Sequence, residues 1–234
     1  MNNKVLHILL GLLLLSCNKP SKDVVTPVPP FVEDKCIEVQ MPNGVGEMDF
    51  TFSESSRLVI NGERSKKVEA DDGNAQFTFS DKVKAPYSAV YPMGVYSSMD
   101  NITIPARQKY YAGRVDDNSA VMLAYSASEG KLALRHAMSY LKLTISPGSL
   151  SSDNLYEIIV SGANGEQLSG DFKPDYKNAT LSAIGKATSI VVRDAAGGIP
   201  MGAPVYIAIP ARRSIKLNFD VADVNGVKRS FKYD

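Results

Sequence analysis

The sequence has little of several residue types on which many enzymes and disulfide-stabilised proteins depend. Its 234 residues include no tryptophan, two cysteines and two histidines. The 26 basic and 25 acidic residues nearly balance. This balance argues against a nucleic-acid-binding protein, because such a protein needs a basic surface to replace the counterions around phosphate. Hydrophobic residues make up 44% and charged residues 22%, so the chain has the composition of a folded globular protein.

The sequence contains one long apolar run, at the N-terminus. Lys4 supplies a positive charge before the run 5–15, which is too short to cross about 30 Å of hydrocarbon but suits a signal peptide. The run ends in LLSC at residues 14–17, which resembles the lipobox of bacterial lipoproteins. We therefore expect residues 1–16 to be a signal peptide and Cys17 to be the lipidated N-terminus. Several acyl chains on one cysteine anchor a protein durably to a bilayer.

Residues 17–34 predict an extended tether between this anchor and the folded protein. The segment contains four prolines among polar residues and has neither a periodic pattern nor an apolar cluster. Once Cys17 is lipidated, Cys36 is the remaining thiol, so an intrachain disulfide is excluded. Because Cys36 stands near the start of an expected strand, we expect it to be a small buried hydrophobic residue.

Beyond the tether, apolar and polar residues alternate with a period of two, which is typical of half-buried strands. The strands expected from this alternation are 49–53, 76–80, 140–145, 205–209 and 217–221, and 229–233 is strand-like. The continuous apolar runs 158–160 and 190–192 predict central strands. Pairs such as Asn61-Gly62 and Asn225-Gly226 separate several of them and favour hairpins, because Asn and Gly adopt positive φ at low cost. The sequence therefore predicts an all-β protein, a sandwich or a barrel, with mainly antiparallel sheets.

Residues 131–141 are the one segment with helical potential. Their leucine, alanine and methionine residues are good helix formers with partial 3.6-residue spacing, so either a short helix or an irregular linker fits. The segment falls between two groups of strands. We therefore expect two domains, 35–134 and 135–234.

Few residues offer catalytic or metal-binding chemistry. His136 is the single imidazole of the mature chain, no G-x-S-x-G motif occurs, and no histidine and cysteine cluster suggests zinc. Acidic turns at 71–74 and 116–118 lack the spacing of a calcium loop, and we expect solvent-exposed turn residues there. The sequence thus predicts neither an enzyme nor a cofactor or metal site.

Two segments resemble those of the fimbrillin family of Bacteroidales lipoproteins. APYSAVYP at 85–92 is similar to the family's Y-x-A-x-Y-P segment, and LRHAMSYLKL at 134–143 to its F-x-H-x-x-S-x-L-x-(I/V/L) segment. Further agreement comes from IPARQ at 104–108, LSG at 168–170 and PVYIAIP at 204–210. Leu134 stands where the family usually has Phe, and the chain ends at Asp234 where relatives usually continue.

The resemblance implies two tandem transthyretin-like β-sandwiches in an outer-membrane lipoprotein at the cell surface or in a fimbria. It implies a pilus subunit, a pilus anchor or an adhesin without catalytic activity. Its partners would be membrane lipid through acylated Cys17 and either other fimbrial subunits, through strand donation, or a host or bacterial surface ligand. His136 would then be a packing residue between the domains.

Proteolytic maturation is a weaker implication of the same resemblance. In pilins of this family an arginine-directed protease can remove the first strand, and this chain offers Arg57 and Arg64. Neither follows the first expected strand closely. We therefore expect both to be ordinary solvated side chains.

A glycan-binding module is the alternative function. Four tyrosines could form a stacking surface for sugar rings: Tyr91, Tyr96, Tyr110 and Tyr111. Packing in the core or at an interface, with the hydroxyl group at the rim, is the competing explanation for these residues. The absence of tryptophan weighs against a stacking platform without excluding it.

The number of expected strands also predicts an assembly surface. Residues 137–234 contain five or six recognisable strands, fewer than the seven or so of a complete sandwich of this size. We therefore expect the second sandwich to be short of a strand and to leave a sheet edge open, which a segment from a partner or a C-terminal extension would complete. Shielding of the edge by Lys228, Arg229 and Lys232 is the competing interpretation.

Overall fold

A computed structural model describes residues 34–146, 148, 150–194 and 197–233. The expected signal peptide at 1–16, the lipid attachment site Cys17 and all but the last residue of the tether at 17–34 lie outside the described residues.

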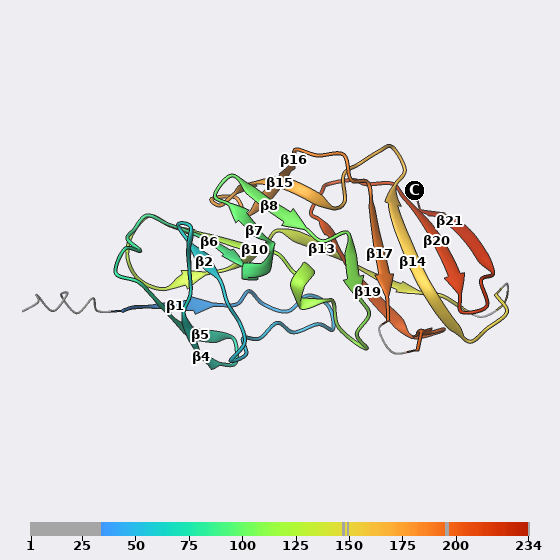
Figure 1. Cartoon of the computed structure of the whole chain (residues 1–234), viewed down its shortest axis with the longest axis horizontal. Coiled ribbons are helices and arrows are strands. Elements are labelled where there is room, and N and C mark those ends of the chain that lie inside the picture. Colours follow the sequence, from blue (N-terminus) through green and yellow to red (C-terminus); the bar gives the residue numbers. More distant parts are fainter. Residues whose placement is uncertain (1–33, 147, 149, 195–196, 234) are drawn as a thin grey trace, which may run out of the picture. The chain divides into compact units, whose positions relative to one another are not determined.

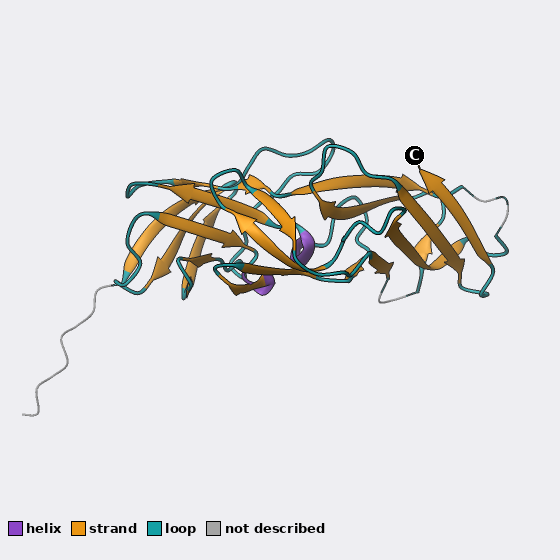
Figure 2. Cartoon of the chain, turned by 90° about the horizontal axis from the view of Figure 1, so that it is seen from above, coloured by secondary structure: helices purple, strands orange, loops and turns teal. Residues whose placement is uncertain are grey.

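The described chain is nearly all β, as predicted. Its helical content is two single turns of 3-10 helix, η1 (Met93–Val95) and η2 (Asp117–Ser119) (Figure 2). Strand pairs are antiparallel except β1 with β11 and β17 with β9. Asn61 and Gly62 have φ of 52° and 86°, as a tight hairpin turn between β2 and β3 requires.

Two sheets form the main walls of the first hydrophobic core (Figure 1). One has the order β11-β1-β5-β4 and the other β12-β10-β6-β2-β3. Their strands are β1 (Lys35–Gln40), β2 (Val59–Ile60), β3 (Glu63–Arg64), β4 (Lys67–Asp71), β5 (Asn74–Phe79), β6 (Tyr87–Tyr91), β10 (Met122–Ser126), β11 (Leu132–Ala133) and β12 (Arg135–His136). Alternate residues such as Val39, Phe77 and Ala89 point into this core and are fully buried.

The second core lies between a six-stranded sheet and a two-stranded one. The larger sheet has the order β21-β20-β14-β17-β9, with β18 paired to β14, and the smaller consists of β13 and β19. Their strands are β9 (Arg107–Lys109), β13 (Met138–Thr144), β14 (Asn154–Gly162), β17 (Ser189–Arg193), β18 (Ile199–Pro200), β19 (Pro204–Pro210), β20 (Leu217–Asp223) and β21 (Lys228–Tyr233).

Strand β19 is buried on both faces and contributes to both cores. Val205, Ile207 and Ile209 belong to the second core, whereas Tyr206 and Ala208 belong to the first. This double burial explains why its sequence is a continuous apolar run, because a strand with no solvent-facing side needs no alternating polar residues.

A fifth sheet combines strands from both halves of the sequence. Its order is β16-β15-β8-β7, formed by β7 (Tyr96–Ser98), β8 (Asn101–Ile104), β15 (Gly170–Asp175) and β16 (Thr180–Ala183). In the same way, β9 pairs with β17 in the six-stranded sheet. The division into domains 35–134 and 135–234 remains a prediction, and these pairings are continuous hydrogen-bonded links across position 134.

Three local expectations are wrong. The candidate helix or linker at 131–141 forms β11, β12 and the start of β13, because Leu134 N–H donates to the Gln40 carbonyl and Ala137 N–H to the Val121 carbonyl. The expected strand at 49–53 has no ladder, although Phe52 is buried in the first core. Cys36 is exposed on β1, because its neighbours Ile37 and Val39 occupy the core.

The strand count for residues 137–234 is also wrong. The described part of this region contains nine strands, β13 to β21, rather than five or six. Short strands such as β16 and β18 have too few residues to show an alternating pattern. The number of strands therefore does not indicate an open sheet edge. Such an edge is identified by the pairing of the individual strands.

Candidate functional site

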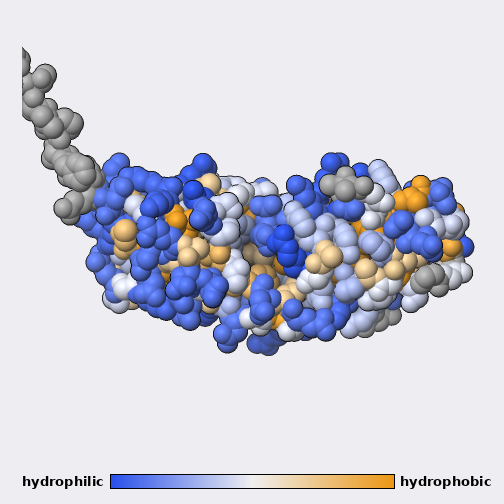
Figure 3. All heavy atoms as spheres, turned by 90° about the horizontal axis from the view of Figure 1, so that it is seen from below, coloured by the Kyte–Doolittle hydropathy of each residue, from blue (hydrophilic) through white to orange (hydrophobic). Residues whose placement is uncertain are grey.

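The first candidate site is an apolar groove beside the second core. A cavity of about 470 Å³ lies between the end of β13 and the strand β21. We call it the edge groove, and its lining residues are Leu143, Thr144, Ile145, Ser146, Gly148, Phe219, Phe231, Lys232 and Tyr233. Figure 3 shows apolar atoms on the surface toward the right-hand end of the molecule, the end at which Figure 1 places β20 and β21.

The inner face of β21 carries large apolar side chains that the described chain covers only in part. Phe231 lies opposite Phe219 in the ladder, and Tyr233 lies opposite Leu217. Paired residues of neighbouring strands project from the same face of a sheet, so Phe231 and Tyr233 face the side of the second core. Leu217 and Phe219 are buried there, yet Phe231 is 44% exposed and Tyr233 64% exposed.

The two outer edges of the β13–β19 sheet differ. On β19, the side chain of Gln108 acts as a substitute strand: Gln108 Nε2 donates to the Ala208 carbonyl at 2.7 Å, and Ala208 N–H donates to Gln108 Oε1 at 3.0 Å. Gln108 is almost fully buried. Along its other edge, β13 pairs with no further strand among the described residues. An extended segment added there would lie opposite β21 and cover its inner face.

The second candidate site is a cavity of about 250 Å³ at the margin of the first core. It lies between the loop that follows β1 and the loop around η2. We call it the Arg114 pocket, and its lining residues are Met41, Met48, Asp49, Phe50, Thr51, Ser53, Ser56, Tyr91, Arg114, Val115, Asp117 and Ala120.

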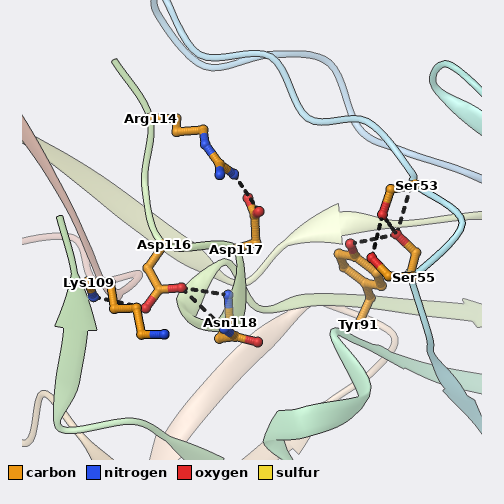
Figure 4. Close-up of polar contacts among 9 residues, drawn as sticks. Ser53, Ser55, Tyr91, Lys109, Arg114, Asp116, Asp117 and Asn118 are labelled. Atoms are coloured by element: carbon orange, nitrogen blue, oxygen red, sulfur yellow. Dashed lines mark hydrogen bonds and ion pairs between the residues drawn. The ribbon is translucent and has the colours of Figure 1, made fainter. Parts of the chain in front are cut away.

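Polar groups stand on two sides of the Arg114 pocket (Figure 4). On one side a chain of hydroxyl groups leads from the buried Tyr91 phenol to Ser56, at 3.3 Å, and on to Ser53 and Ser55. Burial raises the pKa of Tyr91, so the phenol stays protonated at neutral pH. On the other side Arg114 forms an ion pair with Asp117.

A buried carboxylate positions that ion pair. Asp116 accepts hydrogen bonds from the backbone N–H of Lys109 at 3.0 Å and of Asn118 at 3.1 Å (Figure 4). It thereby caps η2, whose first residue is Asp117. The expectation that the turn residues at 116–118 are all exposed to solvent is wrong for Asp116, which is 4% exposed because it satisfies these two backbone donors.

His136 contacts the loop that follows β1 and forms one wall of the pocket. Its ring lies 4.8 Å from that of Phe50, centroid to centroid, in an edge-on contact. Nδ1 lies 2.9 Å from the Tyr140 hydroxyl and Nε2 lies 3.2 Å from the Asn43 carbonyl. A carbonyl only accepts, so Nε2 carries the proton and Nδ1 accepts from Tyr140. Burial lowers the pKa of His136, which keeps the ring neutral in a packing role.

The tyrosines proposed for sugar stacking lie in different surroundings. Tyr91 belongs to the first core, Tyr96 packs against that core, and Tyr110 packs against the second core. Tyr111 is half-buried, and the guanidinium of Arg114 lies over its ring at 4.4 Å. Tyr111 therefore adjoins the Arg114 pocket through Arg114, whereas Tyr110 does not line it.

The two candidate cleavage residues also differ. Arg57 is half-buried, and its guanidinium donates to the carbonyls of Glu54 and Ser56 at 2.9 and 2.7 Å. Arg64 is exposed in the short strand β3. Both residues follow β1, which lies between β5 and β11 and supplies Ile37 and Val39 to the first core.

The described residues contain neither a metal-binding cluster nor a membrane-spanning helix. No group of three or more His, Cys, Asp or Glu residues in this part of the chain could hold a metal ion. Within the same residues, no helix is long and apolar enough to cross a membrane.

Sequence reasoning missed both cavities. The Arg114 pocket combines two loops that are far apart in the sequence, so no local spacing reveals it. The edge groove had a local signal, the alternation of Phe231 and Tyr233 with polar residues in the expected strand 229–233. The alternation does not show which strands, if any, cover that face.

Comparisons with known proteins identify no family. No family model matches the chain, and no curated protein matches it. Among solved structures, the chain is similar to one described as a "putative cell adhesion protein" from Bacteroides ovatus, with 11% sequence identity and a TM-score of 0.48. The similarity covers 86% of each chain. A likeness at this level assigns neither a family nor a function.

Proposed function

We propose that this protein is a lipid-anchored surface protein of the fimbrillin type, which acts as a pilus subunit, anchor or adhesin by accepting a strand at the edge groove. The observation that carries the proposal is the exposed inner face of β21 opposite the unpaired edge of β13. Unpaired backbone groups supply hydrogen bonds to an incoming strand, and an apolar groove accepts its alternate side chains.

The chemistry of the groove favours an extended apolar segment as the occupant. Leu143, Ile145 and Phe219 offer apolar surface, and Lys232 is the one charged side chain in the lining. The competing interpretation, in which basic residues shield the edge, is met only in part. Lys228 and Lys232 alternate with Phe231 along β21, so their side chains start from the opposite face and Lys232 only borders the groove. Arg229 lies on the same face as Phe231, opposite Val221 in the ladder, but does not line the groove.

Multimer formation tests the proposal. We expect material purified from the cell surface to run as a ladder of heat-labile multimers. Replacing Phe231 and Tyr233 together by Ser should abolish the ladder, because an incoming strand loses its apolar cover. Tyr156→Ser is the matched control, since it removes an exposed aromatic side chain from β14 of the same sheet, next to the inward-facing Leu155. A wild-type protein without multimers, or a double variant that still forms the ladder, contradicts strand acceptance.

Membrane attachment is tested separately. Labelling cells with a fatty-acid analogue should mark the wild-type protein, and Cys17→Ala should lose both the label and the membrane fractionation. Cys36→Ala is the matched control, because Cys36 is the exposed thiol of the folded part. Unchanged labelling in Cys17→Ala would show that the anchor assignment is wrong.

We propose no cleavage at Arg57 or Arg64 as part of this function. N-terminal sequencing of surface material should find a blocked, lipidated Cys17 and no sequence that starts at residue 58 or 65. A new N-terminus at either position would instead favour a processed pilus subunit over an anchor or adhesin.

A further inference from the structure

The Arg114 pocket is a built polar cavity that strand acceptance does not use. Its lining includes two side chains that are more than nine-tenths buried and polar: Ser56, which is 7% exposed, and Tyr91, which is 8% exposed. Their hydroxyl groups lie 3.3 Å apart. Ser56 Oγ also accepts from the Ser53 N–H and contacts Ser53 Oγ, so it is the Tyr91 hydroxyl that keeps capacity for a further partner. The cavity therefore has hydrogen-bonding groups at its buried end as well as at its mouth.

The charges around the cavity decide which ligands fit. Asp49 and Asp117 are acidic and Arg114 is basic, so the lining has a net charge of −1. Asp49 forms no hydrogen bond or ion pair with any described residue, so its two oxygens are available to accept. An anionic ligand would meet two carboxylates. A ligand with several hydroxyl groups, which both donate and accept, suits this mixture of carboxylates, guanidinium and hydroxyl groups.

Apart from Thr51 and Ser53, the remaining lining is apolar. Met41, Met48, Val115 and Ala120 are buried residues of the first core, and Phe50 is half-buried beside them. A pyranose ring has an apolar C–H face and a rim of hydroxyl groups, so it matches a cavity with apolar and polar walls. The volume of about 250 Å³ is below the range of about 300–1,000 Å³ typical of drug-sized ligands and leaves room for a single ring.

We propose that the Arg114 pocket binds one neutral pyranose residue of a glycan. Asp49 and Asp117 accept hydrogen bonds from adjacent ring hydroxyls, and Arg114 donates to a hydroxyl or ring oxygen. The Tyr91 hydroxyl, which Ser56 holds in place, contacts the deepest ring hydroxyl. This inference rests on the proposed surface role and names a ligand class for it. It also moves the glycan site from a stacking surface of four tyrosines to a cavity that Tyr91 lines and in which Tyr111 only supports Arg114.

Saturation-transfer difference NMR on the detergent-solubilised full chain tests the proposal. The probes are the methyl glycosides of glucose, galactose, mannose, fucose and N-acetylglucosamine, with N-acetylneuraminic acid as the anionic probe. We expect at least one neutral glycoside to bind and the anionic sugar not to compete with it. Asp49→Asn and Asp117→Asn should each weaken binding and raise the dissociation constant about tenfold, because each variant loses a charged acceptor.

Matched variants separate this site from any other. Asp71→Asn, the same type of change at an exposed position of strand β4, should leave the dissociation constant unchanged. Tyr91→Phe should weaken binding while retaining the ring in the core. Absence of binding by every neutral probe, preference for the anionic sugar, or equal binding by Asp49→Asn and the wild type would each overturn the proposal.

The same variants separate this inference from the proposed function. If Asp49→Asn and Asp117→Asn lose sugar binding but retain the multimer ladder, the pocket proposal stands independently of strand acceptance. A wild-type protein that forms multimers but binds no neutral sugar overturns the pocket proposal alone.

Discussion

The two hydrophobic cores are closed to different extents. The first lies between sheets of four and five strands, and its large residues, such as Phe77 and Phe79, are fully buried. The second lies between six strands and two, so the larger sheet extends past the smaller and leaves Phe231 and Tyr233 exposed. The same alternating pattern therefore gives a buried face in one region and an exposed one in the other. The difference depends on whether a second sheet covers the strand.

Matched phenylalanine substitutions should show the largest contrast. Phe77→Ala removes a fully buried ring from the first core and should lower the free energy of unfolding by about 3–5 kcal/mol. Phe231→Ala removes a ring that is 44% exposed and should cost less than about 1 kcal/mol in the monomer. Urea denaturation of the two variants at low protein concentration measures both values.

Equal losses in the two variants would contradict this contrast, because they would mean that Phe231 is covered in the monomer. Repeating the measurement on multimeric material tests the contrast between the two variants further. There Phe231→Ala should become more costly, since an added strand would bury the ring.

Gln108 should give the second largest effect, because it closes one edge of the two-stranded sheet. Gln108→Ala leaves the buried N–H and carbonyl of Ala208 without their partners and should cost about 2–3 kcal/mol. Gln76→Ala, a change at an exposed position of β5, is the control and should lie within about 0.5 kcal/mol of the wild type. Urea denaturation again gives the values. A neutral Gln108→Ala would indicate that water or a neighbouring group replaces the side chain.

The strands that can be predicted from the sequence are those whose burial alternates. The residues of β5 and β20 alternate in the sequence and are buried on one face, so composition and period are sufficient to place these strands. The apolar runs 158–160 and 190–192 are likewise sufficient to identify β14 and β17. Residues 131–141 could not be predicted from composition and period. Their side chains favour a helix, but hydrogen bonds to β1 and to Val121 hold the segment in strands. Pairing with distant strands overrides local propensity, and a single sequence does not reveal those partners.

The candidate sites are less predictable for a related reason. Of the four tyrosines proposed for stacking, Tyr91 lines the Arg114 pocket, and Tyr111 adjoins it through the Arg114 guanidinium. Asp116 is in a turn by its sequence, yet it is buried because it caps η2 and binds Lys109 N–H. Whether such residues form a site depends on which loops pack against each other. The two loops of the Arg114 pocket are about 60 residues apart, and no sequence motif spans them both.

The smallest predicted effect is a pH dependence confined to the closed region. The ordinary pKa of His136 is 6.5, and burial lowers its pKa in the folded protein. The unfolded chain therefore takes up the proton first as the pH falls. Stability from neutral His136 is fully present above about pH 6.5 and is lost as the pH falls from there through the lower pKa of the folded state. We expect a smaller loss than for Gln108→Ala.

Urea denaturation between pH 7.5 and pH 5 checks this effect against His136→Gln, which does not titrate in that window. The carboxylates with resolved shifts, such as Glu47 and Asp223, have lowered pKa values and titrate below it. Wild-type stability should thus fall relative to His136→Gln as the pH decreases. Acidification should remove the hydrogen bond that Nδ1 accepts from Tyr140 and so loosen the wall of the Arg114 pocket, without affecting Phe231 or Tyr233. A wild-type protein that gains stability relative to the variant would show that a nearby acidic group, rather than burial, controls His136.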